Sequence, residues 1–131
     1  MTLVLLSGGF SSLVCVGQAL GAGRSLETLT FDDDATPAAE IERAATVARA
    51  WSLEHETIDL SSLSLRPSSR LVAFAALAAA ARRPAELVVG GDVDAAIVAR
   101  LSALLGCEVR APMAGYSAAE TRRLASRLGL G

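Results

Sequence analysis

Short runs of apolar residues alternate, along this 131-residue chain, with longer segments in which apolar residues recur at every third or fourth position. The short runs predict five buried strands, at residues 3–6, 26–31, 55–60, 86–89 and 108–110. The longer segments predict five helices, at residues 12–20, 36–51, 70–82, 93–105 and 117–129. This alternation is typical of an α/β fold. We expect one domain over residues 1–131, with an open parallel sheet in the order 3-2-1-4-5 and helices on both faces.

Residues at the ends of these segments support the helix boundaries. Thr36 is expected to cap the second helix, with Pro37 in its first turn, and Ser117 and Glu120 have the spacing of a capping box. Gly106 follows the fourth helix, where a glycine suits a left-handed cap. The apolar residues at helical spacing in the second helix are expected to pack against the sheet: Ile41, Ala44, Val47, Ala48 and Trp51.

Composition changes this picture little but excludes several classes of protein. With 52% hydrophobic residues, the chain can cover both faces of a sheet. The best candidate for a membrane span, residues 71–81, is about half as long as a bilayer requires, and no basic segment precedes the first apolar run. A net charge of −2 argues against a general nucleic-acid binder. We therefore expect a cytoplasmic protein without a membrane or general nucleic-acid partner.

The segment between the first strand and the first helix carries the clearest chemical signal. Two glycines, Gly8 and Gly9, stand among the hydroxyl residues Ser7, Ser11 and Ser12. Glycines let backbone N–H groups approach an anion closely, and the start of a helix favours a phosphate. The chain has no lysine, which excludes a Walker A loop. An ordinary turn from strand to helix is the alternative interpretation.

Two further segments are expected beside this loop, because ligands bind at the carboxyl ends of parallel strands. They are residues 31–34, with three aspartates, and residues 90–92, with two glycines. The glycines would let a flat ring approach the backbone closely. Together, the three segments predict a nucleotide site.

Four stretches resemble the PP-loop ATP pyrophosphatases, and within them the 7-cyano-7-deazaguanine synthase family of queuosine biosynthesis. Residues 5–12, LLSGGFSS, are similar to its LLSGGxDS motif, and residues 29–48, LTFDDDATPAAEIERAATVA, to the segment that begins TFDYGQRH. Residues 66–81, RPSSRLVAFAALAAAA, take the place of its Pro-Gly-Arg-Asn stretch. Residues 109–130, VRAPMAGYSAAETRRLASRLGL, resemble its APL…SKAEI…LG segment.

This resemblance implies an adenine nucleotide alpha-hydrolase-like fold that binds ATP, with magnesium as a further cofactor, and adenylates a carboxylate or similar acceptor with release of pyrophosphate. The residues it assigns to phosphate are Ser7, Gly8, Gly9, Ser11 and Ser12. Those it places around adenosine are Thr30, Phe31, Asp32, Gly90 and Gly91. Arg70 and Asp92 are candidates for a contact with substrate or phosphate.

Departures from the family pattern leave a second interpretation open. Ser11 stands where the family has an aspartate, and the carboxylates of residues 32–34 are candidates to hold magnesium instead. The alternative for that acidic run is a solvated cap of the second helix. No zinc is expected, since the family's four-cysteine tail has no counterpart here. The chain is thus either an adenylating enzyme or a catalytically impaired relative that binds nucleotide or a partner protein.

A partner is expected under both interpretations, either a second copy of the chain or a larger enzyme. The apolar residues of the third helix are a candidate interface, with core packing as the alternative. A Ser-His-Asp hydrolase is not supported. His55, the only histidine, begins the third strand and so lies at the opposite end of the sheet, and the chain contains no Gly-x-Ser-x-Gly motif.

Overall fold

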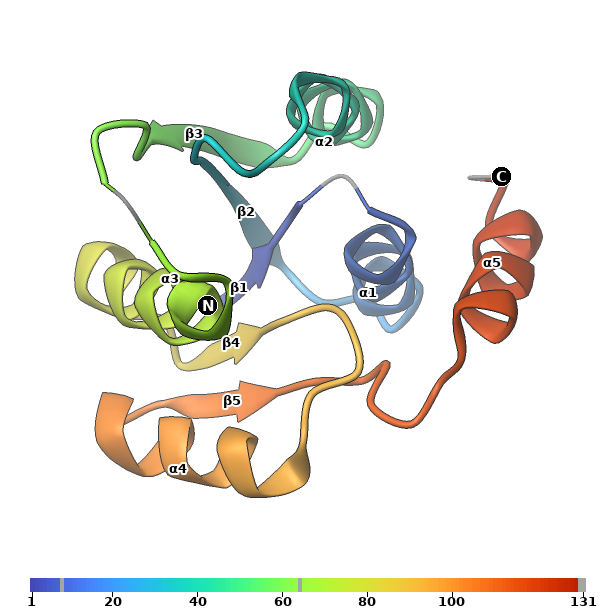
Figure 1. Ribbon diagram of the computed structural model, residues 1–131. Helices are drawn as coiled ribbons and strands as arrows, with labels where there is room; N and C mark the ends of the chain where they lie inside the picture. The colour runs from blue at the N-terminus through green and yellow to red at the C-terminus, as the bar shows by residue number, and fades with distance from the viewer. Residues whose placement is uncertain (8, 64, 130–131) are drawn as a thin grey trace.

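The computed structural model describes residues 1–7, 9–63 and 65–129, which form one parallel sheet with helices on both faces (Figure 1). The strands are Thr2–Leu5 (β1), Leu26–Asp32 (β2), Glu54–Asp59 (β3), Glu86–Val88 (β4) and Glu108–Arg110 (β5). The helices are Phe10–Gly21 (α1), Ala38–Ala50 (α2), Pro67–Arg82 (α3), Ala95–Leu105 (α4) and Ala118–Arg127 (α5). The strand order β3-β2-β1-β4-β5 confirms the expected topology.

Strand β1 occupies the centre of the sheet and pairs in parallel with β2 on one side and β4 on the other. After β1 the chain builds outward to β2 and β3, and it then returns to the far side of β1 for β4 and β5. The strand order therefore reverses beside β1. In open parallel sheets, the carboxyl ends of the strands at such a point form the usual ligand site.

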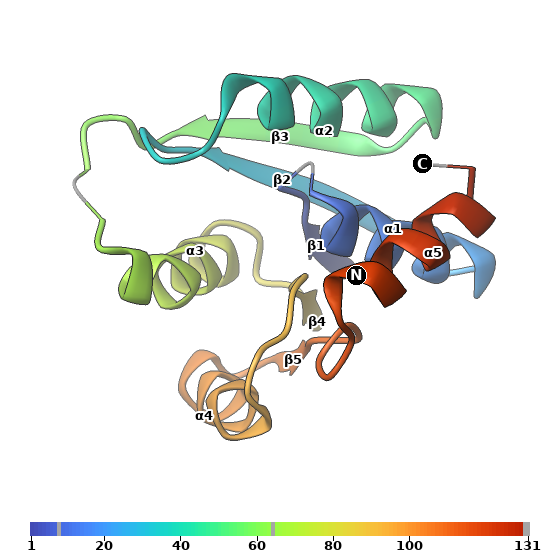
Figure 2. The same ribbon diagram turned by 45° about the vertical axis from the view of Figure 1, so that its right-hand side comes forward.

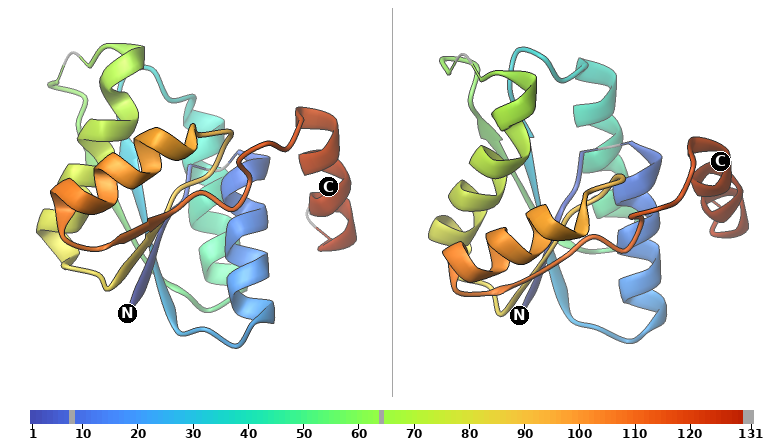
Figure 3. Two further views of the ribbon diagram at one scale, coloured as in Figure 1. Left: turned by 90° about the horizontal axis from the view of Figure 1, so that it is seen from below. Right: turned by 60° about the horizontal axis from the view of Figure 1, so that its bottom comes forward.

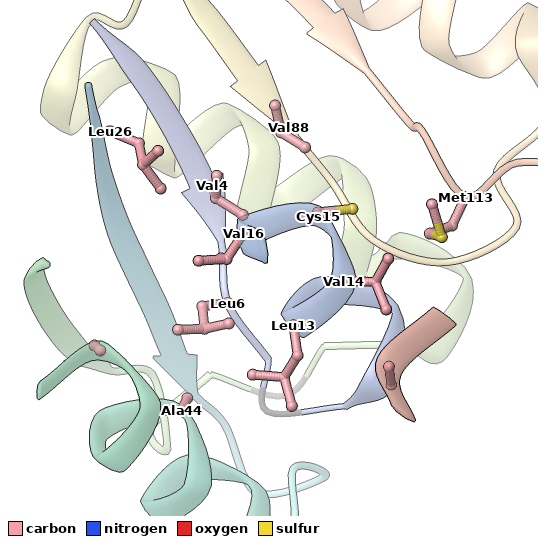
Figure 4. Close-up of a cluster of buried hydrophobic side chains, with 12 residues drawn as sticks. Val4, Leu6, Leu13, Val14, Cys15, Val16, Leu26, Ala44, Val88 and Met113 are labelled. Carbon is pink, nitrogen blue, oxygen red and sulfur yellow. The ribbon is translucent and has the colours of Figure 1, made fainter. Parts of the chain in front are cut away.

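Two apolar cores lie on the two faces of the sheet because side chains alternate along each strand. Figure 4 shows the core beneath α1, where Val4 of β1 and Leu6, which follows β1, meet Leu13 and Val16 of α1. The second core lies beneath α3 and α4, and Leu3 of β1 contributes to it from the opposite face. Figure 3 shows α3 and α4 on one side of the sheet and α1 and α2 on the other.

Helix α5 lies outside α1 rather than on the sheet itself (Figure 2). Ala125 of α5 is fully buried in the core beneath α1, and Met113 reaches the same core from the segment before α5. Gly17 of α1 allows this approach, because a Cβ there would lie 2.7 Å from Cδ1 of Leu128. The small side chain at position 17 thus lets the end of the chain pack closely on α1.

Most helix ends agree with the sequence, but the start of α2 corrects one prediction. Ser117 and Glu120 form the expected capping box, and Gly106 adopts the left-handed conformation with φ 67°. Thr36 does not cap α2, which begins at Ala38 with Pro37 as its N-cap residue. The Thr36 hydroxyl is drawn away because it hydrogen-bonds to the buried Asp33 carboxylate.

Helix α3 begins three residues earlier than expected, at Pro67. A proline in the first turn of a helix loses no hydrogen bond, since the N–H groups there have no partner in the helix. Within the described residues, no helix is both long enough and apolar enough to cross a membrane.

Candidate functional site

Two cavities adjoin at the carboxyl edge of the sheet, where β1, β2 and β4 end. The first, of about 250 Å³, lies between the end of β2 and the starts of α2 and α3. The second, of about 330 Å³, lies between the segment after β1, the start of α1 and the segment after β4. Leu5, Ser7, Glu40 and Phe74 line both cavities. We call the two together the edge groove, with a first and a second cavity.

The loop after β1 is held by its own hydroxyl groups. The Ser7 N–H donates to Oγ of Ser12 at 3.1 Å, and the Gly9 N–H donates to Oγ of Ser7 at 3.3 Å. The Ser12 hydroxyl, which is buried, donates to the Gly9 carbonyl at 3.1 Å. Ser7 and Ser12 therefore brace the loop, while the half-buried Ser11 lines the second cavity.

Helix α1 begins at this loop with conditions that favour an anion. Its N-cap residue is Gly9, which has no side chain to cap the helix, and its first turn contains no acidic residue. The first N–H groups of a helix lack partners within the helix, and they carry the positive end of its dipole. Phe10 and Ser11 of this turn line the second cavity. A phosphate in that cavity would thus meet backbone donors directly.

Gly90 packs the end of β4 against the same turn of α1. A Cβ at Gly90 would lie 2.9 Å from the backbone nitrogen of Ser12 and 3.2 Å from the carbonyl carbon of Ser11. Only a residue without a side chain allows this approach. Gly91, which follows, has φ +89° and therefore favours glycine for its conformation. The first glycine thus brings strand and loop together, and the second turns the chain away.

Apolar side chains form one wall of the first cavity. Phe31 of β2 and Phe74 of α3 are stacked, with 4.8 Å between ring centroids and 26° between ring planes. The guanidinium carbon of Arg70 lies 5.3 Å from the Phe74 centroid. Such a wall suits a flat ring, because stacking does not require matched hydrogen bonds. Three leucines from β1, from the residue after it and from β2 also line this cavity: Leu5, Leu6 and Leu29.

A charged pair at the rim of the first cavity joins α3 to the loop after β2. Arg70 donates from Nε to Oδ2 of Asp33 at 2.8 Å and from Nη2 to Oδ1 at 3.1 Å. The same Nη2 donates to Oγ1 of Thr36 at 2.8 Å, and the Thr36 hydroxyl donates to Asp33. Asp33 is almost fully buried, with 3% of its side chain exposed.

The electrostatics of this pair follow from its geometry. Burial alone would raise the pKa of Asp33, but the hydrogen bonds from Thr36 and Arg70 and the charge of Arg70 hold it below the usual 3.8. The carboxylate is therefore ionised at neutral pH and cancels the charge of Arg70. This result argues against the solvated cap considered for the acidic run, since Asp33 lies inside the structure.

Glu40 is the only acidic residue that lines either cavity among the described residues, and it lines both. It belongs to the first turn of α2. One turn further on, Arg43 places its guanidinium carbon 5.9 Å from the ring centroid of Phe10 in α1. This contact holds the start of α2 against the start of α1, so Glu40 and the loop after β1 face the same space.

The structure brings together most, but not all, of the residues that the sequence singled out. Eight of them line the edge groove: Ser7, Gly9, Ser11, Ser12, Phe31, Arg70, Gly90 and Gly91. Three others line neither of its cavities. The Thr30 hydroxyl donates to the Leu6 carbonyl, the Asp32 carbonyl accepts from the Leu60 N–H at 2.7 Å, and Oδ1 of Asp92 accepts from the Gly115 N–H at 2.8 Å. Gly8 lies outside the described residues.

Among the groove residues that sequence reasoning did not assign to the site are Glu40, Phe74 and Thr36. Phe74 follows Arg70 by four positions, which places both on one face of α3. Glu40 stands in the first turn of a helix whose start lies at the sheet edge. These two signals were available in the sequence. The role of Thr36 was not, because it depends on the contact between Asp33 and Arg70.

Other cavities are less suited to a nucleotide. A larger one, of about 510 Å³, lies near the starts of β2 and β3. Three carboxylates line it, those of Glu27, Glu54 and Glu56, and its one arginine, Arg82, donates to Glu56 at 2.6 Å. A phosphate there would meet mostly negative charge. Among the described residues, no three His, Cys, Asp or Glu side chains gather as a metal-binding group.

Solved structures of other proteins share this fold. A predicted subunit of tRNA methyltransferase from Methanocaldococcus jannaschii is 17% identical, with a TM-score of 0.63, over 95% of this chain and 73% of its own. NMN synthetase from Francisella tularensis is 16% identical, with a TM-score of 0.71, over 99% of this chain and 62% of its own. A 4-thiouridine synthetase, solved with RNA and ATP, is 20% identical, with a TM-score of 0.73, over 98% of this chain and 41% of its own. The chain thus spans less than two thirds of the latter two proteins, and these likenesses establish the fold.

The sequence supplies the family. The family model described as queuosine biosynthesis protein QueC matches residues 1–89. This segment runs from β1 through β4 and contains the loop after β1, the Asp33–Arg70 pair and Glu40. The chain therefore belongs to the QueC family of queuosine biosynthesis proteins, within the PP-loop ATP pyrophosphatases.

Proposed function

We propose that the chain binds ATP in the edge groove and uses it to adenylate a carboxylate or similar oxygen acceptor, with release of pyrophosphate. The observation that supports this most is the turn formed by Gly9, Phe10 and Ser11, where the start of α1 opens into the second cavity. The QueC family match covers that turn, and a structure of the same fold contains ATP.

The two cavities suit two parts of ATP. The triphosphate would lie in the second cavity, against the backbone donors of α1 and the Ser11 hydroxyl. The adenine ring would lie in the first, against the stacked rings of Phe31 and Phe74. An acceptor oxygen would then attack the α-phosphorus, and the bond to the bridging oxygen would break as pyrophosphate leaves. The chain would contribute positioning and charge stabilisation rather than a covalent step.

A second function is favoured by one specific feature, the loss of charged groups from the groove. Ser11 supplies no carboxylate, and Asp33 cancels the charge of Arg70. The chain also lacks lysine. These features support a protein that binds nucleotide without cleaving it, which is the alternative to the adenylating enzyme.

Titration calorimetry with ATP, ADP and AMP, each with and without magnesium, tests the proposal directly. We expect magnesium-dependent ATP binding, and a coupled assay for pyrophosphate with carboxylic acid acceptors then separates the enzyme from the binding protein. Binding of AMP without magnesium would favour a sensor of nucleotide. An absence of binding by every nucleotide would contradict both functions.

The variant Gly9→Val locates the site. The backbone of Gly9 has φ −78° and ψ 160°, which any residue adopts, and a Cβ there would contact only Oγ of Ser7, at 3.4 Å. The fold should therefore tolerate the change, whereas the larger side chain would enter the second cavity. We expect ATP affinity to fall at least about tenfold, or 1.4 kcal/mol. Unchanged affinity in a folded variant would remove the loop from the site.

We further propose that the chain functions in a complex with a second chain, either another copy of itself or a larger cytoplasmic enzyme. Two apolar side chains of α3 support this, since Val72 is 47% exposed and Leu77 is 40% exposed. Exposed apolar groups gain free energy when another surface covers them. Light scattering at micromolar concentration tests this for self-association, and a monomer that binds ATP tightly would contradict it.

A further inference from the structure

The edge groove poses an electrostatic problem for the proposed function. ATP carries several negative charges, and the side chains that line the groove offer little positive charge to balance them. Arg70 is the only basic residue among the described lining residues, and its charge is matched by Asp33 at 2.8 Å. Glu40 adds a negative charge to both cavities. The carboxylate of Glu40 and the phosphates of ATP would repel each other strongly in a cavity from which water is partly excluded.

Magnesium fits this donor set. The ion prefers oxygen ligands, and it is usually bound by one or two carboxylates together with the phosphates of a nucleotide. The lining of the second cavity includes one acidic residue, Glu40, together with Ser11 and the first turn of α1. In the described part of the chain, Glu40 has no hydrogen bond or ion pair that would occupy its carboxylate. A cation would convert this repulsive group into a ligand.

We propose that Glu40 supplies the magnesium carboxylate that Ser11 does not, by binding the cation of Mg-ATP from α2 across the second cavity. The proposal rests on the proposed function, since it assumes that ATP occupies the groove. Arg43, one turn beyond Glu40, contacts Phe10 in the first turn of α1, and Glu40 and Phe10 both line this cavity. The aspartates of residues 32–34 are less suited, because Asp33 is engaged by Arg70 and residues 32–34 line neither cavity.

The variant Glu40→Gln tests the proposal, because it should change ATP affinity in opposite directions with and without magnesium. Gln keeps the size of Glu but removes the charge. With magnesium present, ATP affinity should fall at least about tenfold, since a carboxylate ligand is lost. Without magnesium, ATP affinity should rise by about threefold or more, since a repulsive charge is lost. Calorimetry measures both affinities. The electron paramagnetic resonance spectrum of Mn²⁺, bound together with ATP in place of magnesium, reports the loss of the protein ligand without any turnover.

Glu42→Gln is the matched control. Glu42 lies two positions further along the same helix, is exposed and lines neither cavity. It should leave ATP affinity unchanged under both conditions. The double variant Ser11→Asp with Glu40→Gln should recover magnesium-dependent binding, because it returns a carboxylate to the second cavity. Thermal unfolding of each variant separates these effects from the weak interaction of Glu40 with the dipole of α2.

Each other outcome overturns the inference. If Glu40→Gln bound ATP more strongly both with and without magnesium, Glu40 would only repel the nucleotide. If it bound ATP more weakly under both conditions, Glu40 would contact the nucleotide directly. Equal changes in Glu40→Gln and Glu42→Gln would show an effect of net charge. Failure of the proposed function is distinct, because the wild-type chain would then bind ATP under neither condition.

Discussion

The two ends of the sheet each hold a carboxylate that is paired with arginine, but the two arrangements differ. At the carboxyl end, Asp33 is 3% exposed and is engaged by one arginine, Arg70, through two hydrogen bonds. At the amino end, Glu86 is 11% exposed and is shared by two arginines, Arg24 and Arg110. These two arginines are 40% and 41% exposed, against 31% for Arg70.

The difference lies in what each carboxylate joins. Glu86 also accepts a hydrogen bond from Thr2, so it joins β1, β4, β5 and the segment before β2. The cavity beside its arginines measures only about 120 Å³. The Asp33–Arg70 pair instead joins two segments at the rim of the groove, whose cavities measure about 250 and 330 Å³. Glu86 thus joins neighbouring strands to one another, whereas the Asp33–Arg70 pair borders the edge groove.

The largest effect on stability should come from Asp33→Ala. This change leaves Arg70 and Thr36 without their shared acceptor in a nearly dry position. We expect the free energy of unfolding to fall by about 2–3 kcal/mol, as for the loss of a hydrogen-bonded charge. Urea denaturation measures it, with Asp34→Ala, at an exposed neighbouring position, as the control. Equal effects of the two changes would make the pair no more than a surface contact.

The pH dependence of stability sharpens the same contrast. Because the pKa of Asp33 is lowered in the folded chain, its contribution is fully present above the usual value of 3.8. It is lost as pH falls through the lower pKa of the folded state. The difference in unfolding free energy between wild type and Asp33→Asn should therefore shrink below about pH 4, the usual range for aspartate. A difference that stays constant down to pH 2 would contradict the ion pair.

Gly90→Ala tests whether the carboxyl edge of the sheet depends on close packing between the backbones of Gly90 and α1. Its Cβ would lie 2.9 Å from the backbone nitrogen of Ser12, which cannot rotate away. We expect a loss of about 1–2 kcal/mol in the free energy of unfolding, typical of overpacking. Gly21→Ala, at the end of α1 with no atom within 4 Å, should instead raise it by about 0.5 kcal/mol. A Gly90→Ala protein as stable as Gly21→Ala would show that the strand end is not packed as described.

The smallest effect should come from Glu86→Gln. Both of its arginines are about 40% exposed, so water screens their charges and weakens these ion pairs. We expect a loss below about 1 kcal/mol, and a loss that shrinks further in 1 M salt because the charges are screened. Urea denaturation at two salt concentrations measures both. A cost as large as that of Asp33→Ala would remove the distinction between the two ends.

The sequence by itself determined the elements, their order and eight of the residues that line the groove. Apolar runs and helical spacing are local patterns, so they specified the strands, and strict alternation then implied the parallel order β3-β2-β1-β4-β5. The loop around Gly9 was recognisable because its glycines and serines are adjacent. The capping box of Ser117 and Glu120 was recognisable for the same reason, since its two residues lie within one turn.

Only the tertiary structure decided which charges meet. Asp33 and Arg70 lie 37 positions apart, so no local pattern could pair them, and that pairing also moved Thr36 from its expected role as a cap. The need for glycine at position 90 arises from the backbone of Ser12, which reaches it across the sheet edge. The position of Glu40 on both cavities depends on how α2 packs against α1. Local periodicity specifies elements, whereas contacts between distant residues exist only once the sheet has brought its strand ends together.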